Sequence, residues 1–141
     1  MIDDTQINEY ICDDTTLTLS DIPDDCSIKI ITKIHPETNT QLEGLYTSGS
    51  KFTTQCESQG FRKIAYYLDR PDVMTVFTTR ITADKTSYPI LLSNGNQIDA
   101  GDLEDNRHFV VWEDPFKKPA YLFALVAGDL DHIEDHFTTM S

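Results

Sequence analysis

Short runs in which apolar and polar residues alternate recur along the chain, and this period of two predicts β-strands. Residues 27–34 and 74–82 alternate in this way and are rich in β-branched side chains, as half-buried strands are. Residues 45–47 and 52–55 lie on either side of Ser48-Gly49-Ser50, which predicts a hairpin with a tight turn. The pattern therefore favours antiparallel pairing.

Further strands are expected towards the C-terminus. Residues 88–92 run into Ser93-Asn94-Gly95-Asn96, where the Asn-Gly pair favours a type I′ turn. Residues 109–112 and 121–126 predict two more strands. The second of these is apolar throughout, so we expect it in the middle of a sheet.

The remaining segments complete an all-β prediction. Residues 1–25 hold eight acidic residues and no basic one, and they predict an edge strand or two. Residues 58–65 predict a short helical turn, which Asp69-Arg70-Pro71-Asp72 ends. Short strands without a long amphipathic helix indicate a sandwich or saddle of mostly antiparallel sheets with one short helical turn.

Composition narrows the partners of the chain. Its 141 residues suit one domain, and a net charge of −13 disfavours nucleic acid and anionic membranes, which need clustered Lys and Arg. No apolar run is long enough to span a membrane, and the first residues do not form a signal peptide. The three cysteines are therefore expected to be reduced thiols in a cytoplasmic protein.

The run Thr54-Gln55-Cys56-Glu57 is the best candidate for a binding site. On a strand, Gln55 and Glu57 would share one face while Cys56 points the other way. Two oxygen acceptors side by side suit an ammonium group, such as the free amino end of a peptide. A surface Glu can equally be idle, and Gln55 can pair with neighbouring backbone, so both interpretations stay open.

The sequence resembles the amino-terminal β domain of the zinc aminopeptidase N (alanyl aminopeptidase) family, in its bacterial branch. The resemblance runs collinearly from about residue 6 to the C-terminus. It is carried by Leu42-Glu43-Gly44-Leu45-Tyr46, Thr54-Gln55-Cys56-Glu57, Tyr67-Leu68-Asp69-Arg70-Pro71-Asp72-Val73, Leu92-Ser93-Asn94-Gly95-Asn96, Asp114-Pro115-Phe116 and Tyr121-Leu122-Phe123-Ala124-Leu125-Val126-Ala127-Gly128.

The resemblance implies a fragment of a zinc-dependent aminopeptidase. In that family, the residues matching Gln55 and Glu57 hold the α-amine of the substrate, so peptide N-termini are the implied partner. The zinc ligands, a His-Glu-x-x-His helix with a distant Glu, lie downstream and are not in this sequence. The implied division is residues 1–129 as part of the β domain and 130–141 as the start of the catalytic domain.

Two consequences of this division are expected. The fragment alone would bind no zinc and hydrolyse nothing, since its other implied partner is the downstream catalytic domain. Further strands would precede residue 6, so the isolated fragment would leave sheet edges unpaired and self-associate.

Metal binding within the chain has weaker support. His132 and His136 would share a helical face, but Ile133 stands where a metalloprotease helix has its Glu. A second group could bind calcium weakly, although it lacks the alternating ligands of an EF-hand loop. That group is Asp99, Asp102, Glu104 and Asp105. We predict no metal site here.

Other chemically notable residues are expected to be structural. The acidic surroundings of Cys56 should raise the pKa of its thiol and disfavour use as a nucleophile. Asp69-Arg70-Pro71 predicts a turn held by an internal ion pair, and Trp112 is expected in the core. His35 and His108 are expected to be structural or surface residues.

Two other classes of protein remain open from the sequence. One is a freestanding β-sandwich binding or interaction module without catalysis, which would bind peptides through the same face. The other is a purely structural domain in which Gln55 and Glu57 satisfy only local backbone.

Overall fold

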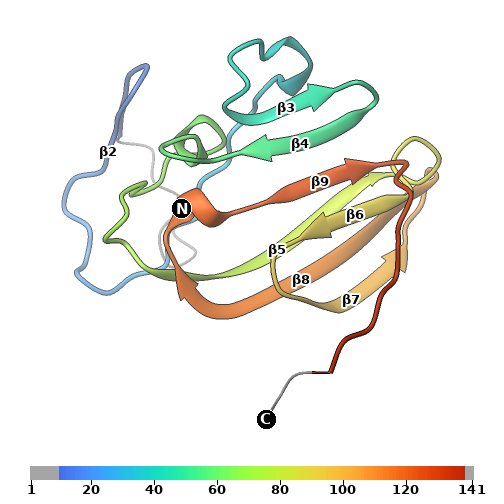
Figure 1. Ribbon diagram of the computed structural model, residues 1–141. Helices are drawn as coiled ribbons and strands as arrows, with labels where there is room; N and C mark the ends of the chain where they lie inside the picture. Colours follow the sequence, from blue (N-terminus) through green and yellow to red (C-terminus); the bar gives the residue numbers. More distant parts are fainter. Residues whose placement is uncertain (1–9, 139–141) are drawn as a thin grey trace.

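The computed structural model describes residues 10–138, and within them the chain is built from short antiparallel strands (Figure 1). The strands are β1 (Ile11–Cys12), β2 (Leu17–Thr18), β3 (Gly44–Ser48), β4 (Lys51–Gln55), β5 (Thr75–Asp84), β6 (Ile90–Ser93), β7 (Asn96–Asp102), β8 (Arg107–Lys118) and β9 (Leu125–Gly128). Three 3-10 helices join them: η1 (Pro36–Thr38), η2 (Phe61–Lys63) and η3 (Ala120–Leu122). The all-β prediction is confirmed, and η2 is the predicted helical turn.

The four-stranded sheet has the order β3-β4-β9-β6. The predicted hairpin is present, with β3 and β4 paired from Gly44 opposite Gln55 to Ser48 opposite Lys51. Strand β9 lies between β4 and β6, so its Val126 is opposite both Thr53 and Leu92. The prediction of an apolar central strand is confirmed, although the strand begins only after η3.

The three-stranded sheet has the order β5-β8-β7 and contains the longest strands. Strands β7 and β8 form a hairpin whose turn has a φ of 57° at both Asp105 and Asn106. Arg107 N donates to Glu104 O across this turn at 3.3 Å. These left-handed values at two central residues are those of a type I′ turn, so the acidic segment forms the tight turn.

The prediction of a type I′ turn at Asn94-Gly95 is wrong. Strands β6 and β7 belong to different sheets, and residues 94–95 carry the chain from one to the other. Gly95 has a φ of 90°, but the Asn94 side chain instead binds a distant segment. Its Oδ1 accepts Ala124 N at 2.6 Å, and its Nδ2 donates to Leu122 O at 3.0 Å.

The core lies between the two sheets, around Ile81 of β5, Leu91 of β6 and Ala127 of β9. Trp112 of β8 packs against this cluster, and its Nε1 donates to Leu91 O at 3.0 Å. The indole thus joins the three-stranded sheet to the four-stranded one. The prediction that Trp112 belongs to the core is confirmed.

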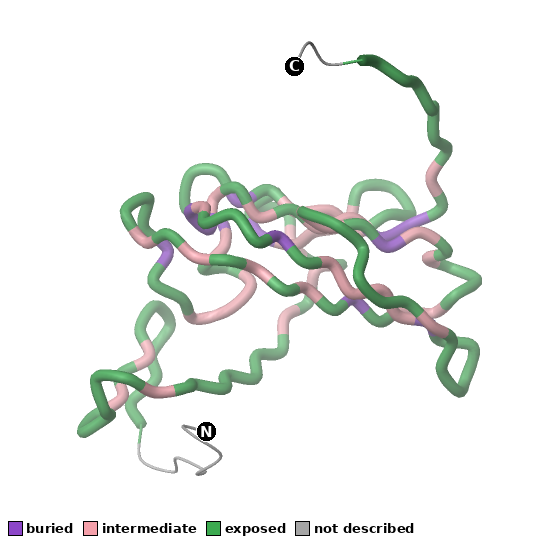
Figure 2. Tube along the Cα trace, turned by 90° about the horizontal axis from the view of Figure 1, so that it is seen from below, coloured by how far each residue is buried: buried purple, intermediate pink, exposed green. Residues whose placement is uncertain are grey.

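Residues 10–34 form a largely exposed segment (Figure 2), which contacts the rest of the chain through hydrogen bonds of Asp13 with Tyr66 and of Thr32 with Ile64. The small strands β1 and β2 fit the predicted edge strands, while residues 1–9 of that prediction lie outside the described residues. The prediction of a regular strand over residues 27–34 is wrong, because the segment contains only a single bridge, at Ile28, and no strand. Ile31 is 84% exposed there. Alternation alone does not provide a paired neighbour.

Residues 129–138 follow β9 without regular structure, and Figures 1 and 2 show them leading away from the sheets. The predicted start of a new domain at residue 130 stays a prediction, and residues 139–141 lie outside the described range. None of the helices between residues 10 and 138 has the length and apolar character needed to cross a bilayer.

Candidate functional site

Gln55 and Glu57 lie where β4 ends. Gln55 is the last residue of the strand, opposite Gly44 of β3, whereas Glu57 already belongs to the turn formed by residues 57–60. The prediction that the two side chains share one face of a strand is therefore wrong, because the strand ends at Gln55. Both are nevertheless exposed, and Cys56 between them is buried with 3% of its surface accessible.

The two candidate residues interact with each other. Gln55 Nε2 donates a hydrogen bond to the main-chain oxygen of Glu57 at 3.2 Å. This is the backbone pairing that the sequence left open for Gln55. It uses an amide donor of Gln55 and none of the Glu57 carboxylate oxygens, so that carboxylate remains at the surface.

Residues 57–60, here called the Glu57 turn, fold back onto the hairpin. Gly60 N donates to Cys56 O at 2.8 Å, and the Glu57–Ser58 peptide bond is cis. A Cβ on Gly60 would lie 2.2 Å from Gln55 O and 3.0 Å from Gly44 N. Only glycine permits such a close approach of two backbones, and the approach places the Glu57 turn directly against β3 and β4.

Helix η2 holds the far end of the Glu57 turn. The Phe61 ring meets Tyr67, Phe123 and Phe77 at centroid distances of 5.1, 5.2 and 6.0 Å, all in edge-to-face arrangements. Such aromatic pairs add to the free energy of burial. The aromatic cluster therefore ties the turn to β5 and to the segment before β9.

The segment after η2 differs from the prediction of a turn with one internal ion pair. Asp69 is buried and pairs with Arg62 of η2, with 3.3 Å between its Oδ2 and Arg62 Nε. Arg70 instead pairs with Asp72 in an exposed contact of 2.8 Å. Asp69 and Arg70 thus serve two separate ion pairs.

Cys56 is not arranged as a nucleophile. Burial and, to a smaller extent, the negative charge of Asp69 together raise the pKa of its thiol to about 11. The predicted direction is confirmed, although burial rather than acidic neighbours is the main cause.

No group of three or more His, Cys, Asp and Glu side chains within residues 10–138 is placed to hold a metal ion. His136 Nε2 lies 3.4 Å from Glu134 Oε1, and both side chains are exposed. His35 is exposed before η1, while the buried His108 has its Nε2 2.8 Å from Tyr88 O.

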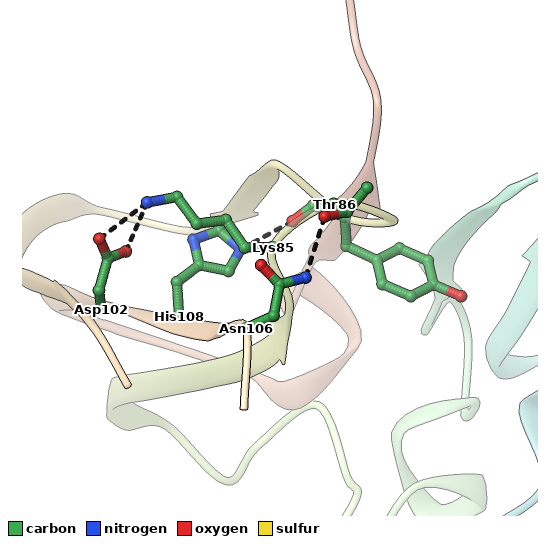
Figure 3. A network of polar contacts seen from close by, with 6 residues as sticks. Lys85, Thr86, Asp102, Asn106 and His108 are labelled. Carbon is green, nitrogen blue, oxygen red and sulfur yellow. Dashed lines mark hydrogen bonds and ion pairs between the residues drawn. The ribbon is translucent and has the colours of Figure 1, made fainter. Parts of the chain in front are cut away.

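Within the acidic group considered for calcium, the Asp102 carboxylate has a structural contact (Figure 3). Asp102 forms an ion pair with Lys85 at 2.7 Å, which lowers the pKa of its carboxyl group. Asn106 in the neighbouring turn donates to Asp84 Oδ2 and Thr86 Oγ1, both at 2.9 Å. These contacts join the β7–β8 turn to the turn between β5 and β6.

The hollows of the surface lie elsewhere. A groove of 590 Å³ runs between residues 32–34 and residues 62–70, and a smaller one of 230 Å³ lies between β1, β2 and residues 28–32. Gln55 and Glu57 line neither of these two grooves. The candidate site is therefore an open surface turn that presents a carboxylate, a type of site suited to binding.

Comparison with known proteins gives the family. The model of the peptidase M1 N-terminal domain matches residues 3–122. Aminopeptidase N of Escherichia coli is 60% identical over 125 residues, which are 89% of this chain and 14% of that protein. Aminopeptidase N of Haemophilus influenzae is 59% identical, again over 89% of this chain and 15% of its own length.

A solved structure agrees with these relatives. Aminopeptidase A of Legionella pneumophila, crystallised in complex with aspartic acid, superposes with a TM-score of 0.80 at 35% identity, covering 93% of this chain and 16% of that one. The fold and the exposed turn define a β domain that presents a carboxylate. The chain belongs to the peptidase M1 N-terminal domain family, and it spans about a seventh of the length of the curated relatives it matches.

Proposed function

We propose that this chain is the substrate-anchoring part of a zinc-dependent aminopeptidase, which releases N-terminal amino acids from peptides. The relatives named aminopeptidase N in Escherichia coli and Haemophilus influenzae support the activity. The ligands of the zinc would come from residues outside this chain, since the described residues offer no suitable group. The isolated chain is then inactive.

Glu57 would bind the free α-amino group of the peptide. Its carboxylate is exposed on a turn that follows the buried Cys56 and is fixed at its C-terminal end, by Gly60 against the hairpin and by Phe61 in the aromatic cluster. At about 4 Å and an effective dielectric constant of about 20, an ammonium and a carboxylate attract by about 4 kcal/mol before desolvation. This attraction favours a free N-terminus over an acylated one.

Gln55 has a supporting role in this proposal. Its bond to the Glu57 main chain stabilises the turn, and its remaining amide oxygen is of the type that accepts from an ammonium group. The observation that carries the proposal is the fixed, exposed Glu57 carboxylate beside this amide.

The test is Glu57→Ala in the intact protein that carries this sequence, assayed on an alanyl substrate. We expect kcat/KM to fall by a factor that corresponds to about 1–3 kcal/mol, as for loss of a charged hydrogen bond. Glu113→Ala, on the exposed face of β8, is the control and should leave the kinetics unchanged. Unchanged kinetics for Glu57→Ala would refute the anchoring role.

Placement in the cytoplasm belongs to the same proposal. Cys12, Cys26 and Cys56 are all free thiols here, which suits a reducing compartment. The proposed partners are peptide N-termini and a catalytic domain of the same polypeptide, with no role for nucleic acid or membranes.

A further inference from the structure

Asp69 is a buried carboxylate that pairs with Arg62 of η2. Only 4% of its surface is accessible. Its Oδ2 accepts from Arg62 N at 3.0 Å and from Arg62 Nε at 3.3 Å. In return, Arg62 Nη2 donates to the main-chain oxygen of Asp69 at 2.7 Å. Side chains and backbone of both residues thus form one closed contact, the Arg62–Asp69 pair.

The Arg62–Asp69 pair lies at the C-terminal end of the Glu57 turn. Arg62 is in η2, which follows the turn directly, so the pair fixes its C-terminal end. The Asp69 charge also contributes to the raised pKa of the Cys56 thiol, which immediately precedes Glu57. The geometric tie runs through Arg62, which joins the Asp69 carboxylate to the segment that directly follows the turn.

Stability alone explains this arrangement poorly. Removing the Asp69 carboxylate from water is costly, and the attraction to Arg62, whose side chain is 46% exposed, repays that cost only in part. The adjacent Arg70–Asp72 pair has a smaller desolvation cost, since both of its side chains remain more than 60% exposed. What the Arg62–Asp69 pair adds is a single defined geometry between η2 and the loop of Asp69.

We propose that Asp69 is a positioning residue, which through Arg62 holds the Glu57 turn where its carboxylate meets the substrate amine. This inference rests on the proposed function of Glu57. Asp69 itself touches no substrate, and its effect passes entirely through the Glu57 turn. Misplacement of a binding group by about 1 Å can cost about a hundredfold in rate.

The test is a double-mutant cycle in the intact protein, with kcat/KM measured on an alanyl substrate. Asp69→Asn keeps the size and one acceptor but removes the charge, and we expect kcat/KM to fall about tenfold or more. In a Glu57→Gln background, the same substitution should cost less than about twofold, because the carboxylate it positions is gone. Asp72→Asn, in the exposed neighbouring pair, should leave kcat/KM unchanged in both backgrounds.

The outcomes separate the two hypotheses. If Glu57→Gln lowers kcat/KM but Asp69→Asn does not, or costs the same in both backgrounds, the positioning role is overturned and the anchoring role survives. If Glu57→Gln itself has no effect, the proposed function fails, and the positioning role fails with it. Should Asp69→Asn not fold, as judged by circular dichroism, Arg62→Gln replaces it in the same cycle with the same criteria.

Discussion

Cys56 and Glu57 meet opposite environments although one peptide bond separates them. Cys56 is buried with 3% of its surface accessible, while Glu57 is exposed in the turn that begins after β4. The buried thiol packs the turn onto the protein, and the exposed carboxylate is thereby presented to solvent. Exposed and buried residues thus still alternate from Gln55 to Glu57, although the strand itself ends at Gln55.

Burial of Cys56 gives a prediction about its reactivity. Because its pKa is raised to about 11, the thiol stays protonated at lower pH, and the thiolate is the reactive form. At pH 8, about one thiol in a thousand would be ionised. We expect iodoacetamide to alkylate the exposed Cys12 first and Cys56 at least about tenfold more slowly, as measured by peptide mass spectrometry.

Denaturant is the control for this comparison, since in urea both cysteines should react at similar rates. Equal alkylation of Cys12 and Cys56 in the native protein would contradict the burial of Cys56.

At the scale of elements, sequence patterns predicted those strands that contain their own pairing signal. The β3–β4 hairpin followed from a Gly-containing turn between two apolar runs, and the apolar run near residue 125 identified the central β9. Residues 27–34 have the same alternation without an adjacent partner in the sequence, and no regular strand forms. Whether a strand forms depends on pairing with segments that are distant in the sequence, and a local pattern does not reveal such a partner.

The sequence identifies the residues of the candidate site, but it does not reveal the contacts that hold them in place. The Gln55-Cys56-Glu57 run is visible in the sequence, and its resemblance to a family draws attention to it. The bond between Arg62 and a buried Asp69 is not visible, since Asp69 stands in a run of charged residues that looks exposed. Burial of one charge among exposed ones follows from the tertiary fold alone.

Gly95 gives a prediction at the crossing between the two sheets. A Cβ at this position would lie 2.0 Å from Glu113 O of β8, and the φ is 90°. Gly95→Ala should therefore force the crossing away from β8 and lower the unfolding free energy by more than about 2 kcal/mol. Urea unfolding of the purified protein followed by circular dichroism measures this change.

Gly49→Ala is the matched control for Gly95→Ala. Gly49 also has a positive φ of 63°, but a Cβ there would have nothing within 4 Å. Gly49→Ala should lower the unfolding free energy only by the cost of a positive φ at alanine, about 1 kcal/mol. Equal losses for the two substitutions would show that contact with β8 is unimportant.

At the scale of the whole molecule, unpaired sheet edges and a high charge act against each other. Strands β3 and β6 are the outer strands of one sheet, and the chain exposes large apolar side chains such as Phe116 at 75%. A net charge of −13 opposes contact between copies. Association should therefore depend on salt, because salt screens the repulsion.

We predict that the isolated chain self-associates, and more strongly in 0.5 M than in about 0.05 M salt. Multi-angle light scattering over a wide concentration range at both salt levels measures the mass. A monodisperse 16.0 kDa species under all conditions would disprove the prediction.

The central place of β9 bears on how the molecule is assembled during translation. Thr53 of β4 pairs with Val126 of β9, which is synthesised more than seventy residues later. The four-stranded sheet therefore cannot be completed before β9 has been made. Until the ribosome releases residues 125–128, the β3–β4 hairpin and β6 have no common neighbour. The turn bearing Glu57 therefore gains its final support late, from residues that are far from it in the sequence.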